Sequence, residues 1–211
     1  MSAQKVRAVF LAGFMGSGKN TVGQELARRL GWNFVDLDAC IETREQQSIP
    51  EIFRLRGEPA FRAAETIVLR DLLTGLLDRP TVVALGGGAF VQQNNRELLR
   101  PWPTVFLDAP VQELWDRCRQ HEARQGVARP LQRDPEQFAR LHAERLPSYR
   151  QASVVIETSG KETDGICSEI ERALQLSASV GDQSSNLPPD QSGEVSPANR
   201  IIGKTLFDDQ P

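Results

Sequence analysis

The sequence predicts an α/β fold in which helices cover both faces of a central five-stranded parallel sheet, giving three layers. Short, continuously apolar runs recur along the chain, and such runs are typical of strands buried on both faces. Segments with helical apolar spacing lie between them, and this alternation favours a doubly wound sheet. The chain has 211 residues, of which 39% are hydrophobic, enough for one domain with a buried core.

The expected strands and helices follow one another along the chain. Strands are expected at residues 6–11, 33–36, 81–85, 104–107 and 153–157. Helices are expected at residues 21–30, 52–56, 58–77, 111–120, 135–142 and 164–176. In the first helix Val22, Leu26 and Leu30 follow helical spacing, and Gly31 stands where a helix should stop.

Composition excludes several classes of protein. No apolar run approaches the about 18 residues that a membrane span needs, so we expect no membrane protein. A formal net charge of -3 gives no reason to expect nucleic-acid binding. Cys40, Cys118 and Cys167 lie far apart without a CxxC pair, which predicts neither a disulfide framework nor a zinc site. These cysteines suit the reducing cytosol, so we expect a cytoplasmic protein. We also expect a monomer.

The composition changes after Leu176. Residues 177–211 are rich in Ser, Pro, Gly, Asp, Asn and Gln and have few large apolar side chains. Such a segment cannot bury enough surface to offset its ordering entropy. We therefore expect one domain over residues 1–176 and a disordered tail over residues 177–211.

A glycine-rich segment follows the first expected strand and opens the first expected helix. It reads GFMGSGKNT over residues 13–21, and its Lys19 is the only lysine between Lys5 and Lys161. This context predicts a phosphate-binding loop. Its backbone N–H groups and the helix N-terminus would bind phosphate oxygens, and Lys19 would reach the β and γ phosphates. A plain glycine-rich turn is the alternative.

The residue after this lysine departs from the usual pattern. Asn20 stands where such loops usually carry Ser or Thr, whose hydroxyl contacts Mg2+. An amide carbonyl oxygen also suits a hard cation, so Asn20 is a candidate Mg2+ ligand. The alternative is that phosphates and water alone hold Mg2+ while Asn20 donates to a phosphate. Thr21 is a candidate contact of the α phosphate.

Two carboxylates end the second expected strand. In open α/β sheets ligands bind beyond the carboxyl ends of the strands, so Asp36 and Asp38 are expected near the phosphate loop. Asp36 would order Mg2+ through water, and Asp38 would accept a proton from a substrate hydroxyl. Each aspartate is also a candidate N-cap, Asp38 for the residues from Ala39 onward, and the two roles are compatible.

Gly86, Gly87 and Gly88 directly follow the third expected strand. Consecutive glycines expose backbone N–H groups and permit the close approach of a ligand. A flexible turn explains them equally well.

Taken together, the motifs of this chain resemble those of shikimate kinases in order and spacing. Besides the phosphate loop and the pair Asp36 and Asp38, they are Ile41-Glu42, Ile52-Phe53, Gly57-Glu58-x-x-Phe61-Arg62-x-x-Glu65, Gly86-Gly87-Gly88, Leu114-Trp115-x-Arg117, Arg129-Pro130-Leu131 and Arg145-x-Pro147-x-Tyr149. The resemblance covers residues 1–176. One further departure is Gln46, where the family usually has glycine; it is expected to affect only the local turn.

The resemblance implies a P-loop kinase that uses ATP, with Mg2+, to phosphorylate the 3-hydroxyl of shikimate, giving shikimate 3-phosphate and ADP. By position, the nucleotide would be bound by Gly16, Ser17, Gly18, Lys19, Asn20, Thr21, Arg117 and Arg129. Shikimate would be bound by Asp38, Arg62, Glu65, Gly86, Gly87, Gly88 and Arg145. Lys19, Asp38 and Arg129 would be catalytic. A substrate-binding helical segment is expected near residues 38–62 and a mobile lid near 119–133.

The chemistry of the side chains agrees with this resemblance. Arginine binds a planar carboxylate through two hydrogen bonds, so Arg62 and Arg145 suit an anionic substrate. Phosphoryl transfer needs mainly positioning and charge stabilisation, a role that suits Arg129 on a closing lid; a solvated arginine is the alternative. Two other functions remain open: a kinase for gluconate or a nucleoside monophosphate, and a nucleotide-binding regulatory module in which Asn20 marks lost catalysis.

Overall fold

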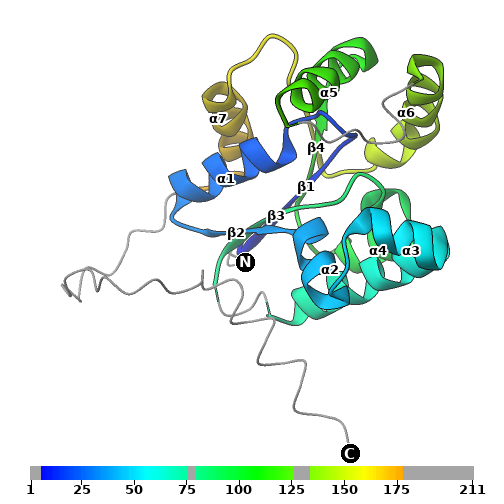
Figure 1. Cartoon of the computed structure of the whole chain (residues 1–211). Coiled ribbons are helices and arrows are strands. Elements are labelled where there is room, and N and C mark those ends of the chain that lie inside the picture. The colour runs from blue at the N-terminus through cyan, green and yellow to red at the C-terminus, as the bar shows by residue number, and fades with distance from the viewer. Residues whose placement is uncertain (1–5, 76–78, 126–133, 178–211) are drawn as a thin grey trace, which may run out of the picture.

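The computed structural model describes residues 6–75, 79–125 and 134–177 (Figure 1). Its five strands form one parallel sheet, as the sequence predicts, and their order in the sheet is β2-β3-β1-β4-β5. They are β1 (Ala8–Ala12), β2 (Asn33–Asp36), β3 (Thr81–Ala84), β4 (Thr104–Asp108) and β5 (Val154–Glu157). In the described part of the chain no helix is long and apolar enough to cross a membrane.

The helices connect these strands. They are α1 (Lys19–Leu30), α2 (Leu37–Glu45), α3 (Ile49–Gly75), the short 3-10 helix η1 (Ala89–Val91), α4 (Gln93–Leu99), α5 (Val111–Gln125), α6 (Pro135–Tyr149) and α7 (Thr163–Leu174). η1 and α4 were not predicted. They are short, and polar residues dominate the α4 sequence QNNRELL, so helical apolar spacing is nearly absent.

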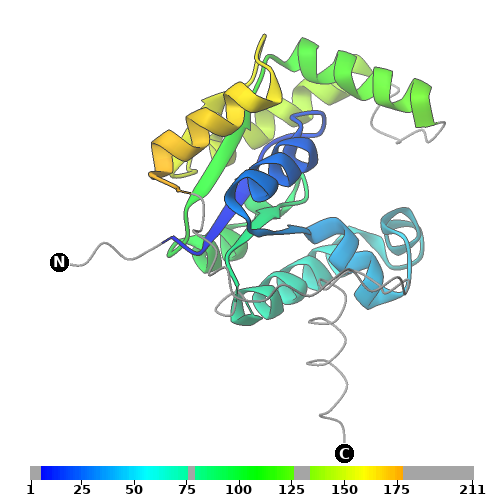
Figure 2. The ribbon, with the colours of Figure 1, turned by 90° about the vertical axis from the view of Figure 1, so that its left-hand side faces the viewer.

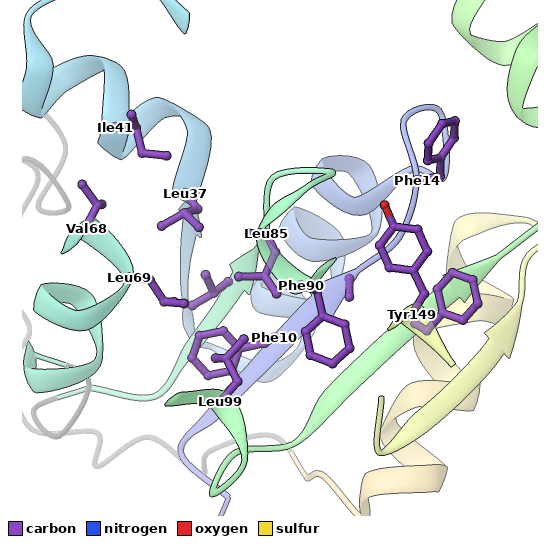
Figure 3. Close-up of a cluster of buried hydrophobic side chains, with 14 of the residues drawn as sticks. Phe10, Phe14, Leu37, Ile41, Val68, Leu69, Leu85, Phe90, Leu99 and Tyr149 are labelled. Carbon is purple, nitrogen blue, oxygen red and sulfur yellow. The ribbon is translucent and has the colours of Figure 1, made fainter. Parts of the chain in front are cut away.

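The helices form the two outer layers. α1 and α7 lie side by side on one face of the sheet, and η1 and α2 to α6 lie on the other (Figures 1 and 2). All of β1 is buried, because Phe10 and Ala12 face one core while Val9 and Leu11 face the other. Figure 3 shows the core on the α2 side, where side chains of α2 and α3 meet those of the sheet. This double burial explains the continuous apolar runs.

Two backbone positions shape the segment between β2 and β3. α3 is kinked at Gly57, which has φ 78° and ψ 171°, so the expected break between two helices is present. Gln46 follows α2 in the left-handed conformation, with φ 52°. Glycine adopts this conformation most readily, which explains why the family's usual glycine suits the position. The Gln46 amide donates a 2.5 Å hydrogen bond to the carbonyl of Thr43, closing the turn locally.

The strand order brings the predicted site residues to one edge. β3 lies between β1 and β2, and the pairs Leu11 with Ala84 and Asp36 with Ala84 place three strand ends level. Because all strands are parallel, the segments that follow β1, β2 and β3 leave the sheet at the same edge.

Candidate functional site

The first part of the candidate site is the loop between β1 and α1. Gly16 and Gly18 have φ angles of 80° and 86°, which a residue with a side chain adopts only with strain. Gly18 ends the loop, and α1 begins at Lys19 rather than at the expected Thr21. The first turn of a helix has N–H groups without a helical partner, so donors gather where the loop ends.

The side chain of Lys19 folds back over this loop. Its Nζ donates to the carbonyl oxygens of Gly13, at 2.9 Å, and Phe14, at 3.0 Å, and to Ser17 Oγ at 3.4 Å. These three acceptors are neutral. A phosphate group would bind the same ammonium through charge-assisted hydrogen bonds, which are about twice as strong as those between neutral groups. The loop thus holds Lys19 close to where phosphates would bind.

Helix α5 packs against the loop and carries Arg117. A Cβ at Gly16 would lie 2.6 Å from the carbonyl oxygen of Leu114 and 2.9 Å from Cys118 Sγ, so only glycine permits this packing. Arg117 donates to Glu113 of the same helix and, at 3.4 Å, to Thr158 after β5. The predicted nucleotide-binding arginine is therefore on a helix that contacts the loop.

Asp36 links the loop to the start of α2. Its Oδ1 accepts a 3.0 Å hydrogen bond from the backbone N–H of Asp38, so Asp36 is the N-cap of α2. The expected capping of the following residues by Asp38 is wrong, because α2 already begins at Leu37 and Asp38 lies in its first turn. Asp36 Oδ2 accepts a 2.6 Å hydrogen bond from Nδ2 of Asn20. Both carboxylate oxygens therefore have protein donors.

The glycine run after β3 lets two charged side chains approach the backbone. A Cβ at Gly86 would lie 2.3 Å from Asp38 Oδ1 and 3.2 Å from Glu65 Oε1. A Cβ at Gly88 would lie 2.2 Å from Nη1 of Arg62. Side chains of α2 and α3 thus occupy the space that larger residues would fill. The sequence indicated a close approach to these glycines but not that the protein's own side chains make it.

Arg62 is held by two carboxylates of its own helix. Its Nη1 donates to Glu65 Oε2 at 3.0 Å, and its Nε and Nη2 donate to Glu58 Oε1 at 3.1 and 3.0 Å. The Glu65 side chain is fully buried, whereas that of Glu58 is 60% exposed. Gln92 also donates to Glu65 Oε2, at 2.6 Å. Glu65 is therefore the buried partner of Arg62, and Glu58 is its solvent-exposed partner.

Burial governs the electrostatics of this pair. It raises the pKa of Glu65 above its ordinary value, the Arg62 guanidinium opposes that rise, and Asp38 adds to it. Glu65 Oε1 has no hydrogen-bond partner among the described residues. Glu65 Oε1 and Asp38 Oδ1 lie 3.2 and 2.3 Å from the position that a Cβ at Gly86 would take, so the two carboxyl groups are close neighbours. Beside these two carboxyl groups the site favours neutral or positively charged partners, whereas the Arg62 guanidinium suits an anion.

Arg145 approaches the same glycine run from α6. Its Nη1 donates to the carbonyl oxygen of Gly87 at 3.1 Å, and the Tyr149 hydroxyl donates to the same oxygen. Burial raises the pKa of Tyr149 to about 12, so its hydroxyl remains a donor at neutral pH. The Arg145 guanidinium also lies over the Phe14 ring, 5.7 Å from its centroid.

The structure gathers most predicted site residues at one edge of the sheet, from six separate segments. Arg129 and residues 126–133 of the predicted lid lie outside the described residues. Thr21 is exposed on α1. Sequence reasoning missed Phe14 and Gln92: Phe14 lies inside the phosphate-loop motif but is apolar, and Gln92 belongs to the unpredicted turn before α4.

Comparisons with known proteins agree with one another. The family model described as Shikimate kinase matches residues 15–175. A shikimate kinase of Halorhodospira halophila is 45% identical over 172 residues, covering 79% of this chain and 93% of the relative. One of Geobacter metallireducens is 42% identical over 174 residues, covering 81% and 93%. The solved shikimate kinase of Acinetobacter baumannii in complex with shikimate has 34% identity and a TM-score of 0.72, covering 81% and 93%.

Proposed function

The chain belongs to the shikimate kinase family and phosphorylates shikimate with ATP, and we propose that the 3-hydroxyl accepts the phosphoryl group. The products are then shikimate 3-phosphate and ADP. One observation carries the proposed site: Gly86 admits the Asp38 carboxylate at the sheet edge where the phosphate loop also begins. Asp38 accepts the proton of the attacking hydroxyl, since it is a half-buried carboxylate and Glu65 is fully buried.

Two arginines orient the substrate in this proposal. Arg62 and Arg145 reach Gly88 and Gly87 from opposite helices, so their guanidinium groups border one space. They bind the carboxylate of shikimate, which is an anion with planar geometry. Glu65 keeps Arg62 in place while the exposed Glu58 gives way to the substrate. The glycine run over residues 86–88 lies between the two arginines and forms the base of the proposed shikimate site.

The nucleotide is proposed to bind the loop over residues 16–21. Lys19 leaves the carbonyls that it now contacts and donates to the β and γ phosphates. Arg117 on α5 and Arg129 in the lid segment neutralise negative charge on the nucleotide and on the transferred group. The protein's contribution is thereby positioning and charge stabilisation, which dominate phosphoryl transfer.

We propose that Mg2+ accompanies ATP at Asn20. The donor set fits an ion held mainly by phosphates and water, since the described residues contain no group of three or more His, Cys, Asp or Glu. Asp36 fixes the amide of Asn20 through Nδ2, which leaves the carbonyl oxygen of Asn20 as the candidate ligand. Asp36 acts at longer range through water. Bound Mg2+ would supply neutralisation of the negative charge on the phosphates.

An acceptor screen tests the function directly. ADP release is measured with shikimate, gluconate and nucleoside monophosphates, and the phosphorylated carbon is identified by NMR. Shikimate alone should give turnover, with phosphate on the 3-oxygen. Lys19→Ala should abolish transfer, and Asp38→Asn should slow it about 10²- to 10⁴-fold. Turnover of gluconate without shikimate would overturn the proposed acceptor, and ATP binding without turnover would favour a regulatory module.

We further propose that the protein is a cytoplasmic monomer that binds no nucleic acid. Exposed large apolar side chains in the described part are few and lie on two elements, with Phe53, Leu55 and Ile67 on α3 and Val155 on β5. A stable protein interface usually requires a larger apolar core. Light scattering of the purified chain should give a single species of one chain's mass, and a stable dimer would contradict this.

A further inference from the structure

The aromatic ring of Phe14 occupies a central place in the phosphate loop. It is 1% exposed, and it meets Phe138 and His142 of α6 edge to face, with ring centroids 4.9 and 5.3 Å away. In Figure 3 the Phe14 side chain lies at the tip of the β1–α1 loop, near Tyr149. Two neighbouring side chains of α6 thus pack against the ring. A loop residue that only shaped the backbone would not need such packing.

The same ring lies next to the arginine that is proposed to bind the substrate. The Cζ atom of Arg145 is 5.7 Å from the ring centroid, within the range of a cation–π contact. Its hydrogen bond from Nη1 to Gly87 fixes one point of the guanidinium, and rotation about that point remains possible. A second contact on an aromatic face limits this rotation. Phe14 thereby restricts the plane in which Arg145 meets a carboxylate.

The backbone of Phe14 belongs to the nucleotide side of the site. Its carbonyl oxygen accepts hydrogen bonds from Lys19 Nζ, at 3.0 Å, and from the N–H of Ser17, at 3.2 Å. Phosphates that draw Lys19 toward themselves remove one of these bonds. One residue therefore contacts the lysine proposed for ATP through its carbonyl and the arginine proposed for shikimate through its ring.

We propose that Phe14 is a positioning residue that orients Arg145 and links the filling of the phosphate loop to the binding of shikimate. This inference rests on the proposed function of Arg145. Because coupling between two sites is reciprocal, Phe14 should contribute equally to the effect of nucleotide on shikimate affinity and to the reverse effect.

Fluorinated phenylalanines provide a test that keeps the size of the ring nearly constant. Successive fluorines at position 14 withdraw electron density from the ring face and weaken its attraction for a cation. Phe138 is the matched control: it is equally buried, in the same cluster, and no cation–π contact involves it among the described residues. Calorimetry measures the Kd of shikimate for each full-length protein, with and without ADP.

The inference predicts a graded effect at position 14. The shikimate Kd should rise with each fluorine, by about 3- to 20-fold over the series, while ADP affinity without shikimate stays constant. ADP should change the shikimate Kd by a smaller factor in the proteins fluorinated at position 14 than in the wild type. KM for shikimate should rise with little change in kcat. Position 138 should show no graded change.

Two results would overturn the inference, and they can be told apart. If fluorination leaves the shikimate Kd unchanged at position 14, or alters it equally at position 138, Phe14 does not position Arg145. If Arg145→Lys also binds shikimate normally, the proposed role of Arg145 itself is wrong. Phe14→Leu and Phe14→Tyr provide a further comparison. Phe14→Leu removes the aromatic ring and should weaken shikimate binding, whereas Phe14→Tyr keeps a ring and should bind shikimate as the wild type does.

Discussion

Asp38 and Gly86 fit together so closely that a Cβ on residue 86 would lie 2.3 Å from Asp38 Oδ1. The nearest obstacle is the end of a side chain rather than backbone, so an added methyl group moves Asp38 instead of unfolding the sheet. The absence of a side chain at residue 86 therefore helps to determine the position of the Asp38 carboxylate.

Gly86→Ala should therefore reduce activity far more than stability. A displacement of about 1 Å at a reacting group can cost about 10²-fold in rate, and we expect a kcat loss of that size. Tm should fall only slightly. Gly165→Ala is the control, since no atom beyond its chain neighbours and the nearby backbone of its own helix lies within 4 Å of an added Cβ, and it should keep full activity. Normal kcat in Gly86→Ala would show that Asp38 tolerates displacement.

Glu58→Gln should improve shikimate binding. Glu58 shares Arg62 with Glu65, but its side chain is 60% exposed, so the ion pair contributes little to stability. Removing its charge frees two guanidinium donors for the substrate carboxylate. We expect KM for shikimate to fall about 2- to 5-fold, in line with the modest strength of such exposed pairs. An increased KM would mean that Glu58 orients Arg62 instead of competing for it.

Glu65 should make stability depend on pH. Its folded-state pKa is raised by burial from the ordinary 4.5, so the folded protein holds this proton more tightly than the unfolded chain. The stability that it adds is full below 4.5 and is lost as pH rises through the raised value. Urea unfolding across this range should show the advantage of the wild type over Glu65→Gln shrinking with pH. An advantage that grew with pH would contradict the sign of the shift.

Asn20→Ser should change the dependence on Mg2+. A hydroxyl one bond closer to the backbone can reach the ion, and the hydrogen bond to Asp36 disappears. We expect half-maximal activity at a Mg2+ concentration about 2- to 5-fold lower, with Asn20→Ala shifted the opposite way. Mn2+ binding to the nucleotide complex, followed by electron paramagnetic resonance, provides a second readout. Equal Mg2+ dependence in all three proteins would mean that phosphates and water alone hold the ion.

Truncation after Ser177 tests the division into a domain over residues 1–176 and a tail. The N–H of Leu176 donates to the carbonyl of Glu171 at 2.8 Å, and Leu176 packs against the hydrophobic core beneath α7, so the last residue of the predicted domain contacts the core. Removing residues 178–211 should shift Tm by less than about 2 °C and leave kcat unchanged. A larger fall in Tm or in kcat would mean that the tail packs on the core.

Local patterns predicted the strands well but not every helix. β1 and β3 are continuous apolar runs because both of their faces are covered, which a reader of the sequence can recognise. α4 escaped prediction because one of its two buried residues, Asn95, is polar. Asn95 accepts from Thr66 at 2.8 Å and donates to the carbonyl of Ala89 at 3.0 Å, so its burial depends in part on a partner in α3, far away in the chain.

Local sequence patterns likewise predicted only part of the candidate site. The phosphate loop could be predicted because its residues are consecutive and their context is local. The contacts of Arg62 with the backbone at Gly88, and of Arg145 with the ring of Phe14, join separate helices and loops. No spacing rule within one segment predicts such pairs.

The sequence by itself determined the α/β class, the phosphate loop and the family, because apolar runs, glycines and a single placed lysine act within short stretches of chain. Only the tertiary structure decided that Asp38 lies against Gly86 and that Phe14 faces Arg145. Those contacts depend on the strand order, which sets three strand ends side by side, and on the crossing helices that return to that edge. Strand order arises from packing over the whole domain, so no local pattern contains it.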